Sequence, residues 1–187
     1  GLSFKAGLAR ADETPSRYDE VVVTATKGKI PKKQVTRAVS VVEGMEMGER
    51  KGNFVTDGLR SVPGVFVRRS GGPGRTSSLI IRGASTTQVH TTMDGAHIGS
   101  PTLGFYDFNN LAPVNMERVE VLRGPNSVLY GADAMGGVVN FETHRGEGPL
   151  SGSYTQEFGS WDTWKETAEA QAGVGNWHLS GGISRLD

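Results

Sequence analysis

The chain has 187 residues, and its 20 basic and 20 acidic side chains give a formal net charge of zero. A neutral chain has no bulk attraction to nucleic acid or to an anionic surface, so we expect no nucleic-acid partner. The absence of cysteine excludes disulfides and thiolate metal sites. The 27 glycines are about twice the ordinary share and indicate many tight turns rather than long helices.

The first 34 residues have many charges and little periodic hydrophobicity, which predicts a flexible arm. Because the chain starts at Gly1 rather than Met, we expect a longer natural precursor. A β-prone run, residues 19–25, lies within this arm, and its flanks offer no partner strand. Two interpretations stay open: a strand that adds to the sheet of another protein, or the first strand of this chain's own sheet.

The residue pattern of the next segment predicts a small α+β domain. A short helix has Phe54, Val55, Leu59 and Val62 along one side and ends at Pro63-Gly64. Asp94-Gly95 is a hairpin turn signal, because both residues tolerate a positive φ. Strands are predicted over residues 38–42, 65–68, 77–82, 89–93, 116–123 and 138–142, with loops over 68–75 and 99–107 and a helical turn over 127–130.

After residue 146 the pattern becomes strictly alternating. Residues 150–158, 164–174 and 177–183 are predicted to form three strands with one apolar and one polar face, and in the last two strands only Glu166 breaks the apolar series. A transmembrane β-barrel meander has this pattern, and so does a soluble antiparallel sheet with one wet face. Open sheet edges are too costly in lipid, so the barrel interpretation predicts further strands outside this chain.

In chain order, several motifs together resemble the TonB-dependent outer-membrane receptor family. Residues 20–25 resemble its energy-coupling box, and residues 59–65 its plug helix and turn. Ile81-Arg82-Gly83 and Met93-Asp94-Gly95 resemble its central hairpin. Residues 117–125 and 129–140 are similar to its most specific signature, while residues 71–83 are most similar to its cobalamin-receptor branch.

The resemblance implies a fold and a place in the cell. We expect an α+β plug domain, with a small mixed sheet and short helices, followed by antiparallel strands of an incomplete transmembrane β-barrel. The expected divisions are an arm at 1–34 with a TonB box at 19–25, a plug at 35–146 and barrel strands at 147–187. The family implies the bacterial outer membrane, contact with its lipid, import of a metal chelate (cobalamin or an iron-siderophore), the periplasmic partner TonB, and no cofactor.

The resemblance also implies roles for individual residues. Arg82 and Arg123 are expected to latch the plug to glutamates of the barrel wall outside this chain, with Glu117 and Glu120 orienting them. Solvation of a strand end or strand face is the alternative for these four residues. The expected TonB-binding residues are Glu20, Val21, Val22, Val23, Thr24 and Ala25.

Two loops are expected to contact substrate on the outer side of the plug. Arg69 and Arg75 supply cations, and Phe105 and Tyr106 supply aromatic faces, which suit an anionic or ring-bearing chelate. No zinc spacing, nucleophile elbow or phosphate-binding loop is present, so we predict no enzyme. A soluble interaction module with a complete sheet is the rival hypothesis, and a signalling receptor is a weaker third.

Overall fold

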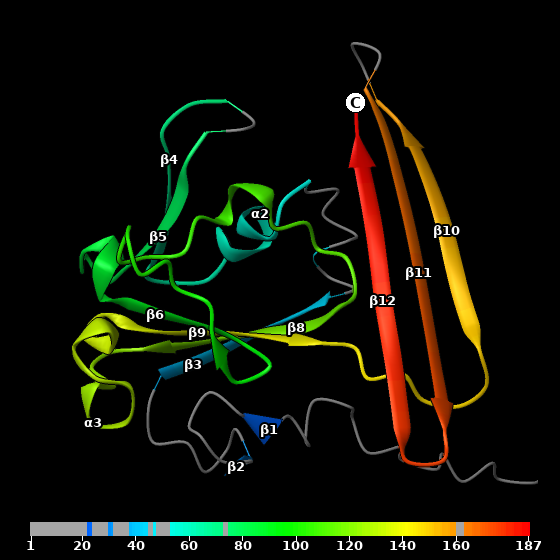
Figure 1. Cartoon of the computed structure of the whole chain (residues 1–187). Coiled ribbons are helices and arrows are strands. Elements are labelled where there is room, and N and C mark those ends of the chain that lie inside the picture. The colour runs from blue at the N-terminus through cyan, green and yellow to red at the C-terminus, as the bar shows by residue number, and fades with distance from the viewer. Residues whose placement is uncertain are drawn as a thin grey trace, which may run out of the picture.

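The computed structural model describes residues 22–23, 30–31, 38–44, 47, 53–72, 75–159 and 163–187. It has two parts: a compact plug with a central sheet, and an upright three-stranded sheet, here called the wall, that stands beside it (Figure 1). The strands of the plug sheet run roughly across the direction of the wall strands. The prediction of a mixed α+β plug followed by antiparallel strands is confirmed.

The plug sheet has five strands in the order β3-β8-β9-β6-β7. Its strands are β3 (Ala38–Glu43), β8 (Met116–Arg123), β9 (Gly137–Thr143), β6 (Val89–Met93) and β7 (Ala96–His97). Only the β6–β9 pair is parallel; the other pairs are antiparallel. Runs of valine and other β-formers explain why these segments are extended. The Asp94-Gly95 turn joins β6 to β7 with φ values of 49° and 82°, as predicted for a tight hairpin.

Short helices and a separate hairpin cover one face of this sheet (Figure 1). Helix α2 (Val55–Leu59) precedes the hairpin of β4 (Val65–Arg69) and β5 (Ser77–Ile81). The remaining turns are η2 (Thr86–Gln88), η3 (Phe108–Asn110), α3 (Ser127–Tyr130) and η4 (Ala132–Ala134). Within the part of the chain that the structure describes, no helix is long and apolar enough to cross a membrane.

The core of the plug lies between α2, the hairpin and the sheet. Val55, Leu59, Ile81, Val119 and Phe141 are each fully buried there. The predicted apolar side of the short helix is therefore its buried side, and Val62 continues it. A smaller cluster on the other face of the sheet contains Leu122, Ala134 and Val138. The plug sheet is thus covered on both faces over part of its area.

The wall consists of β10 (Ser151–Phe158), β11 (Trp164–Val174) and β12 (Trp177–Leu186), paired in sequence order. Its outer face is apolar and exposed: Phe158, Trp177, Leu179 and Ile183 are each 65–76% exposed. Side chains two residues apart share a face, so this face is the alternating apolar set of the sequence. An apolar face of this size, exposed on the far side from the plug, suits contact with lipid.

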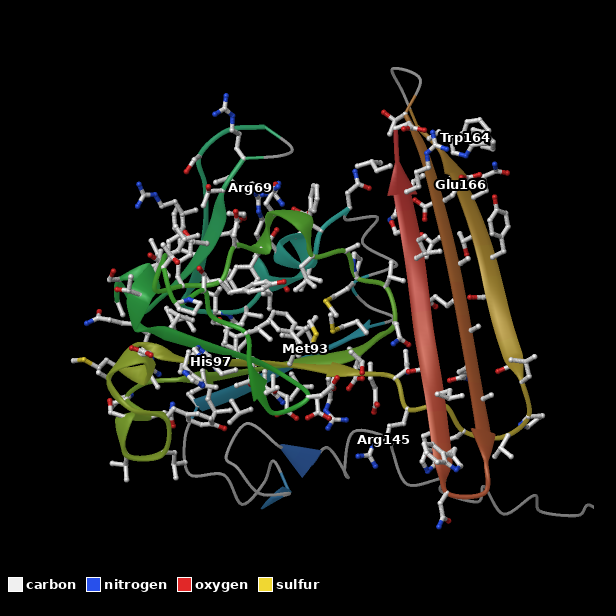
Figure 2. All side chains as sticks on the ribbon, viewed as in Figure 1. Arg69, Met93, His97, Arg145, Trp164 and Glu166 are labelled. Carbon is white, nitrogen blue, oxygen red and sulfur yellow. The ribbon has the colours of Figure 1, made fainter. Side chains whose placement is uncertain are left out.

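Polar residues interrupt the outer face near one end of the wall. Glu166 shares this face with Trp164, and Figure 2 shows both near the same end of the wall. The Tyr154 hydroxyl donates a hydrogen bond of 2.9 Å to Glu166 Oε1. The same cross-strand row contains Gln156 on β10 and Arg185 on β12. A row of polar side chains therefore crosses the wall close to its end.

Two expectations about strand pairing are wrong. The run at residues 19–25 has a partner in its own flank, because β1 (Val22–Val23) pairs antiparallel with β2 (Ile30–Pro31). The two motifs expected to form one central hairpin also belong to different sheets, since β5 pairs with β4 and β6 pairs with β7 and β9. In both cases the local β-propensity was correct, while the partner depends on turn geometry that the motifs do not specify.

Candidate functional site

The two motif arginines, 41 positions apart in the chain, meet at one corner of the plug. A Cβ built on Gly64 would lie 3.7 Å from Cγ of Arg82 and 3.8 Å from Cδ of Arg123. Gly124 also lies beside Arg82, since a Cβ built on Gly124 would be 3.3 Å from Nη1 of Arg82. Both glycines have positive φ values, 76° and 111°, so the turns themselves require glycine. The side chains of Arg82 and Arg123 therefore lie together over two glycine turns, here called the arginine corner.

The arginine corner is held by backbone and hydroxyl oxygens. Arg123 donates 2.9 Å and 3.0 Å hydrogen bonds to the Pro63 carbonyl and the Ser40 hydroxyl. Its buried Nε has no hydrogen-bond partner among the described residues. Among those residues, no carboxylate forms an ion pair with Arg82 or Arg123. The latch role of these two arginines stays a prediction, and the guanidinium groups are of the kind that binds carboxylates strongly.

The acidic residues expected to orient these arginines instead contact a residue that the sequence reasoning did not single out. Arg118 bonds Glu117 at 3.0 Å, Glu120 at 3.1 Å and Glu142 at 3.2 Å. Burial lowers the pKa of Arg118, but the hydrogen bond and charge of Glu120, with the charges of Glu142 and Glu117, outweigh it and raise that pKa. Glu120 is fully buried. The orienting role of Glu117 and Glu120 stays a prediction, and the alternation of charges in residues 117–120 is the signal that points to Arg118.

The structure places Arg69, the first residue expected to contact substrate, beside α2 of the plug (Figure 2). Its Nη2 donates to Asp57 Oδ1 at 2.7 Å and to Thr56 Oγ1 at 2.8 Å. Its guanidinium carbon also lies 5.5 Å from the ring centre of Phe54, a cation–π distance. The first of the four expected substrate contacts is therefore fixed in one orientation by three residues that sequence reasoning missed.

A cavity of about 60 Å³ lies against this arginine. It is lined by Phe54, Thr56, Arg69, Gly71, Gly72, Ser77 and Asn109. The hydroxyl of Ser77 is buried and has no hydrogen-bond partner among the described residues. That oxygen has almost no exposed surface and is closed off from the cavity, so the charged group of the lining is the side chain of Arg69.

The aromatic residues expected in the second loop are less exposed than the arginines. Tyr106 packs edge-on against Phe108 with ring centres 4.9 Å apart. Burial, and then the charge of Asp107, raise the pKa of Tyr106, so its hydroxyl stays neutral and can donate. Phe105 is half-buried and Arg75 is exposed. The structure does not bring Phe105 and Tyr106 into contact with Arg69, and their role in substrate binding stays a prediction.

Of the expected TonB-binding residues, Val22 and Val23 lie in β1, while Glu20, Val21, Thr24 and Ala25 lie outside the described residues. In Figure 1, β1 lies near the same end of the wall as the turn between β11 and β12, and the β4–β5 loop points to the opposite end. Strand β1 and the loop end of the β4–β5 hairpin are thus separated along the direction of the wall strands.

These features define a class: a plug held beside a wall of lipid-facing antiparallel strands. The TonB-dependent Receptor Plug Domain family matches residues 31–138. The chain belongs to this family of TonB-dependent receptors. Family membership places it in the bacterial outer membrane with the plug inside the barrel, and its relatives are transporters and receptors rather than enzymes.

Known proteins resemble this chain in sequence and in fold. The vitamin B12 transporter BtuB of Vibrio vulnificus is 36% identical over 90% of the chain, and that of Photobacterium profundum is 37% identical over 76%. The chain spans only 28% and 23% of the length of these two relatives. The structure of Pseudomonas aeruginosa FpvA bound to pyoverdines has a TM-score of 0.73 at 24% identity, covering 88% of this chain and 22% of FpvA. The ferric yersiniabactin receptor FyuA of Yersinia pestis has a TM-score of 0.62 at 25% identity, covering 81% of this chain and 24% of FyuA.

Proposed function

We propose that the receptor containing this chain imports a metal chelate across the outer membrane with energy supplied through TonB. Cobalamin is the preferred substrate, because both vitamin B12 transporters match the chain at more than 35% identity. An iron-siderophore is the second candidate, supported by the fold similarity to FyuA and FpvA. The observation on which the proposal mainly depends is the separation of β1 from the β4–β5 loop along the wall.

Substrate capture is assigned to the surface of the plug around Arg69. Asp57 and Thr56 fix the guanidinium, and Phe54 covers one of its faces, so the group is oriented before substrate arrives. The adjoining cavity is lined by Arg69 and by the side chains of Phe54 and Thr56 that hold it. The space is too small for a whole chelate, so it would receive one polar substituent at the edge of a larger site formed with Arg75, Phe105 and Tyr106.

The latch is assigned to the arginine corner. Arg82 and Arg123 have no carboxylate partner among the described residues, which supports a role for glutamates of the remaining barrel wall. Charge-assisted bonds to both guanidinium groups would hold this corner against the barrel. The latch would keep the plug closed until force is applied at the other end.

Coupling is assigned to residues 20–25. TonB would pair with this segment by strand addition, in which backbone hydrogen bonds give affinity. The internal pairing of β1 with β2 is weak in one respect, because Val22 lies opposite Pro31, which has no N–H to donate. A strand from TonB could therefore replace β2 at low cost, and the segment would serve as a pulling point.

The proposal is tested with the full-length receptor in cells that lack their own cobalamin receptor. Uptake of labelled cobalamin and of a ferric siderophore is measured in parallel, with and without TonB. Deletion of residues 21–24 should abolish uptake but leave substrate binding to cells unchanged. Deletion of residues 11–14, an equally long segment of the arm, is the matched control and should preserve uptake. Unchanged uptake after the first deletion would refute the assignment of the coupling segment.

A further inference from the structure

The edge of the plug next to the wall makes a set of specific contacts with the inner face of β11 and β12. The backbone N–H of Asn115, just before β8, donates a 2.7 Å hydrogen bond to Glu169 Oε1 on β11. Its side-chain Nδ2 lies 3.3 Å from the Ser180 hydroxyl on β12. Asn115 has a φ of 54°, a left-handed conformation that asparagine tolerates better than most residues. The wall therefore contacts both the backbone and the side chain of one turn residue.

A second plug segment, just after β9, contacts the same strands. The Ser180 hydroxyl donates to the carbonyl of His144, and a ring nitrogen of His178 lies 2.8 Å from the carbonyl of Gly146. Gly173 on β11 donates a 2.7 Å backbone bond to the Gly148 carbonyl. The two plug segments are also joined to each other, because the N–H of His144 donates to the Asn115 carbonyl at 3.1 Å. The open end of the β8–β9 hairpin is thus held as a unit.

Glycines let the two surfaces approach closely. A Cβ built on Gly182 of β12 would lie 2.3 Å from Cγ1 of Val114, so a larger residue at position 182 is excluded as long as Val114 keeps that methyl group. A Cβ on Gly146 would lie 1.9 Å from the Leu179 carbonyl oxygen and 2.5 Å from that of Ala172. These distances are shorter than non-bonded atoms allow, and because the atoms beside Gly146 belong to the backbone, position 146 requires glycine for the contact to exist. The plug and wall are fitted together at this edge.

We propose that these contacts, here called the wall seam, form a fixed attachment that stays closed while substrate passes. The seam comprises Val114, Asn115, His144 and Gly146 of the plug and Glu169, Gly173, His178, Ser180 and Gly182 of the wall. Glu169 is a positioning residue, because it holds the turn that starts β8. The chain path supports the proposal, since only seven residues separate the end of β9 from the start of β10.

The seam differs from the rest of the plug in how force would reach it. A pull on the N-terminal segment passes first through β3, an edge strand that pairs only with β8. The seam lies beyond β8 and β9 and is backed by the covalent connection to β10. The route for substrate would accordingly open away from this edge. This inference rests on the proposed function, because it describes what stays in place during import.

A disulfide across the seam tests the proposal. This chain has no cysteine, so Val114→Cys with Gly182→Cys places one defined pair within it, and the unsubstituted receptor, oxidised in parallel, controls for cysteines elsewhere. The short distance between these positions brings the two sulfurs within bonding range after a small adjustment. The control pair, Ala172→Cys with Leu179→Cys, joins two register partners within the wall. Both oxidised receptors should import substrate as well as their reduced forms. Loss of uptake on oxidation of the seam pair alone, reversed by reduction, would overturn the proposal.

A second measurement tests the seam without transport. Hydrogen exchange at the Asn115 amide in the purified full-length receptor should accelerate about tenfold in Glu169→Ala, because a hydrogen bond to a charged acceptor is lost. Glu169→Gln retains an acceptor oxygen and should restore much of the protection, while the Val139 amide in β9 should be unaffected in both. If wild-type receptor failed to import, the proposed function would fail, but protection at Asn115 would still decide whether the seam exists. Equal exchange in all three proteins would refute it.

Discussion

The plug sheet and the wall are both built from paired strands, but they bury their side chains differently. In β8 and β9, residues on both faces are covered, and the buried run Val119, Glu120, Val121, Leu122 has no alternation. In β11 and β12, one face meets the plug and the other stays exposed, so polar and apolar residues alternate. An alternating pattern therefore indicates that the two faces of a sheet have different surroundings. A strand that is covered on both faces need not alternate.

The largest expected effect is in the plug core. Phe141→Ala removes a fully buried ring that packs against Phe108 and should destabilise the plug by about 3–5 kcal/mol. Hydrogen exchange of the plug amides in the folded receptor measures this change. Ile183→Ala, on the outer face of β12, should leave the plug amides unchanged. Comparable exchange in the two variants would contradict the difference between the sheets.

The second largest effect is expected when a charge is placed on the lipid-facing side of the wall rather than on its opposite face. Ile183→Lys places a charge on the lipid-facing side and should destabilise the inserted barrel by about 2–4 kcal/mol if it lies near the bilayer centre. Gln171→Lys puts the same side chain on the opposite face, where a polar residue already stands, and should cost far less. Urea titration of the full-length receptor in lipid vesicles, followed by gel mobility of the folded form, measures both. Equal losses would mean that the two faces are equivalent.

The smallest of the three effects concerns the charged pairs of β8. Arg118→Ala leaves the fully buried Glu120 without its 3.1 Å partner and should cost about 1–3 kcal/mol of plug stability. Arg118→Lys keeps the charge and should recover part of the loss, although an ammonium cannot reproduce the contacts of a guanidinium with three carboxylates. Denaturant titration with a plug-specific fluorescent label measures both variants. A neutral effect of Arg118→Ala would show that Glu120 is compensated by other groups.

The sequence predicted the elements well and the partners less well. The strand at residues 116–123 and the turn at residues 127–130 agree with the structure, because β-branched runs and glycine turns specify local backbone. The wall strands were recognised from strict alternation. The partner of β1 was missed, because pairing over a turn within a charged arm has no compositional signal.

The candidate site was predicted in part for a similar reason. Arg82 and Arg123 were identified from motifs, but their meeting over Gly64 is a tertiary contact between distant segments. Arg69 was identified by its charge, whereas its neighbours Asp57 and Phe54 lie on another element and become visible only once α2 packs beside β4. Glu169 was not identified from the sequence, because a polar residue on an alternating strand gives no sign that a turn of the plug binds it.

The polar row that crosses the outer face of the wall has a consequence for how the receptor sits in its membrane. A carboxylate such as Glu166 is unfavourable in hydrocarbon and tolerated among headgroups, so the bilayer boundary should pass close to that row. Trp164 and Phe158, two positions nearer the strand ends, then lie in the interfacial layer where aromatic rings are favoured. A shift of the barrel along the membrane normal, in either direction, would bury charge or expose apolar side chains. A few side chains at one rim therefore set how deeply the barrel lies in the bilayer.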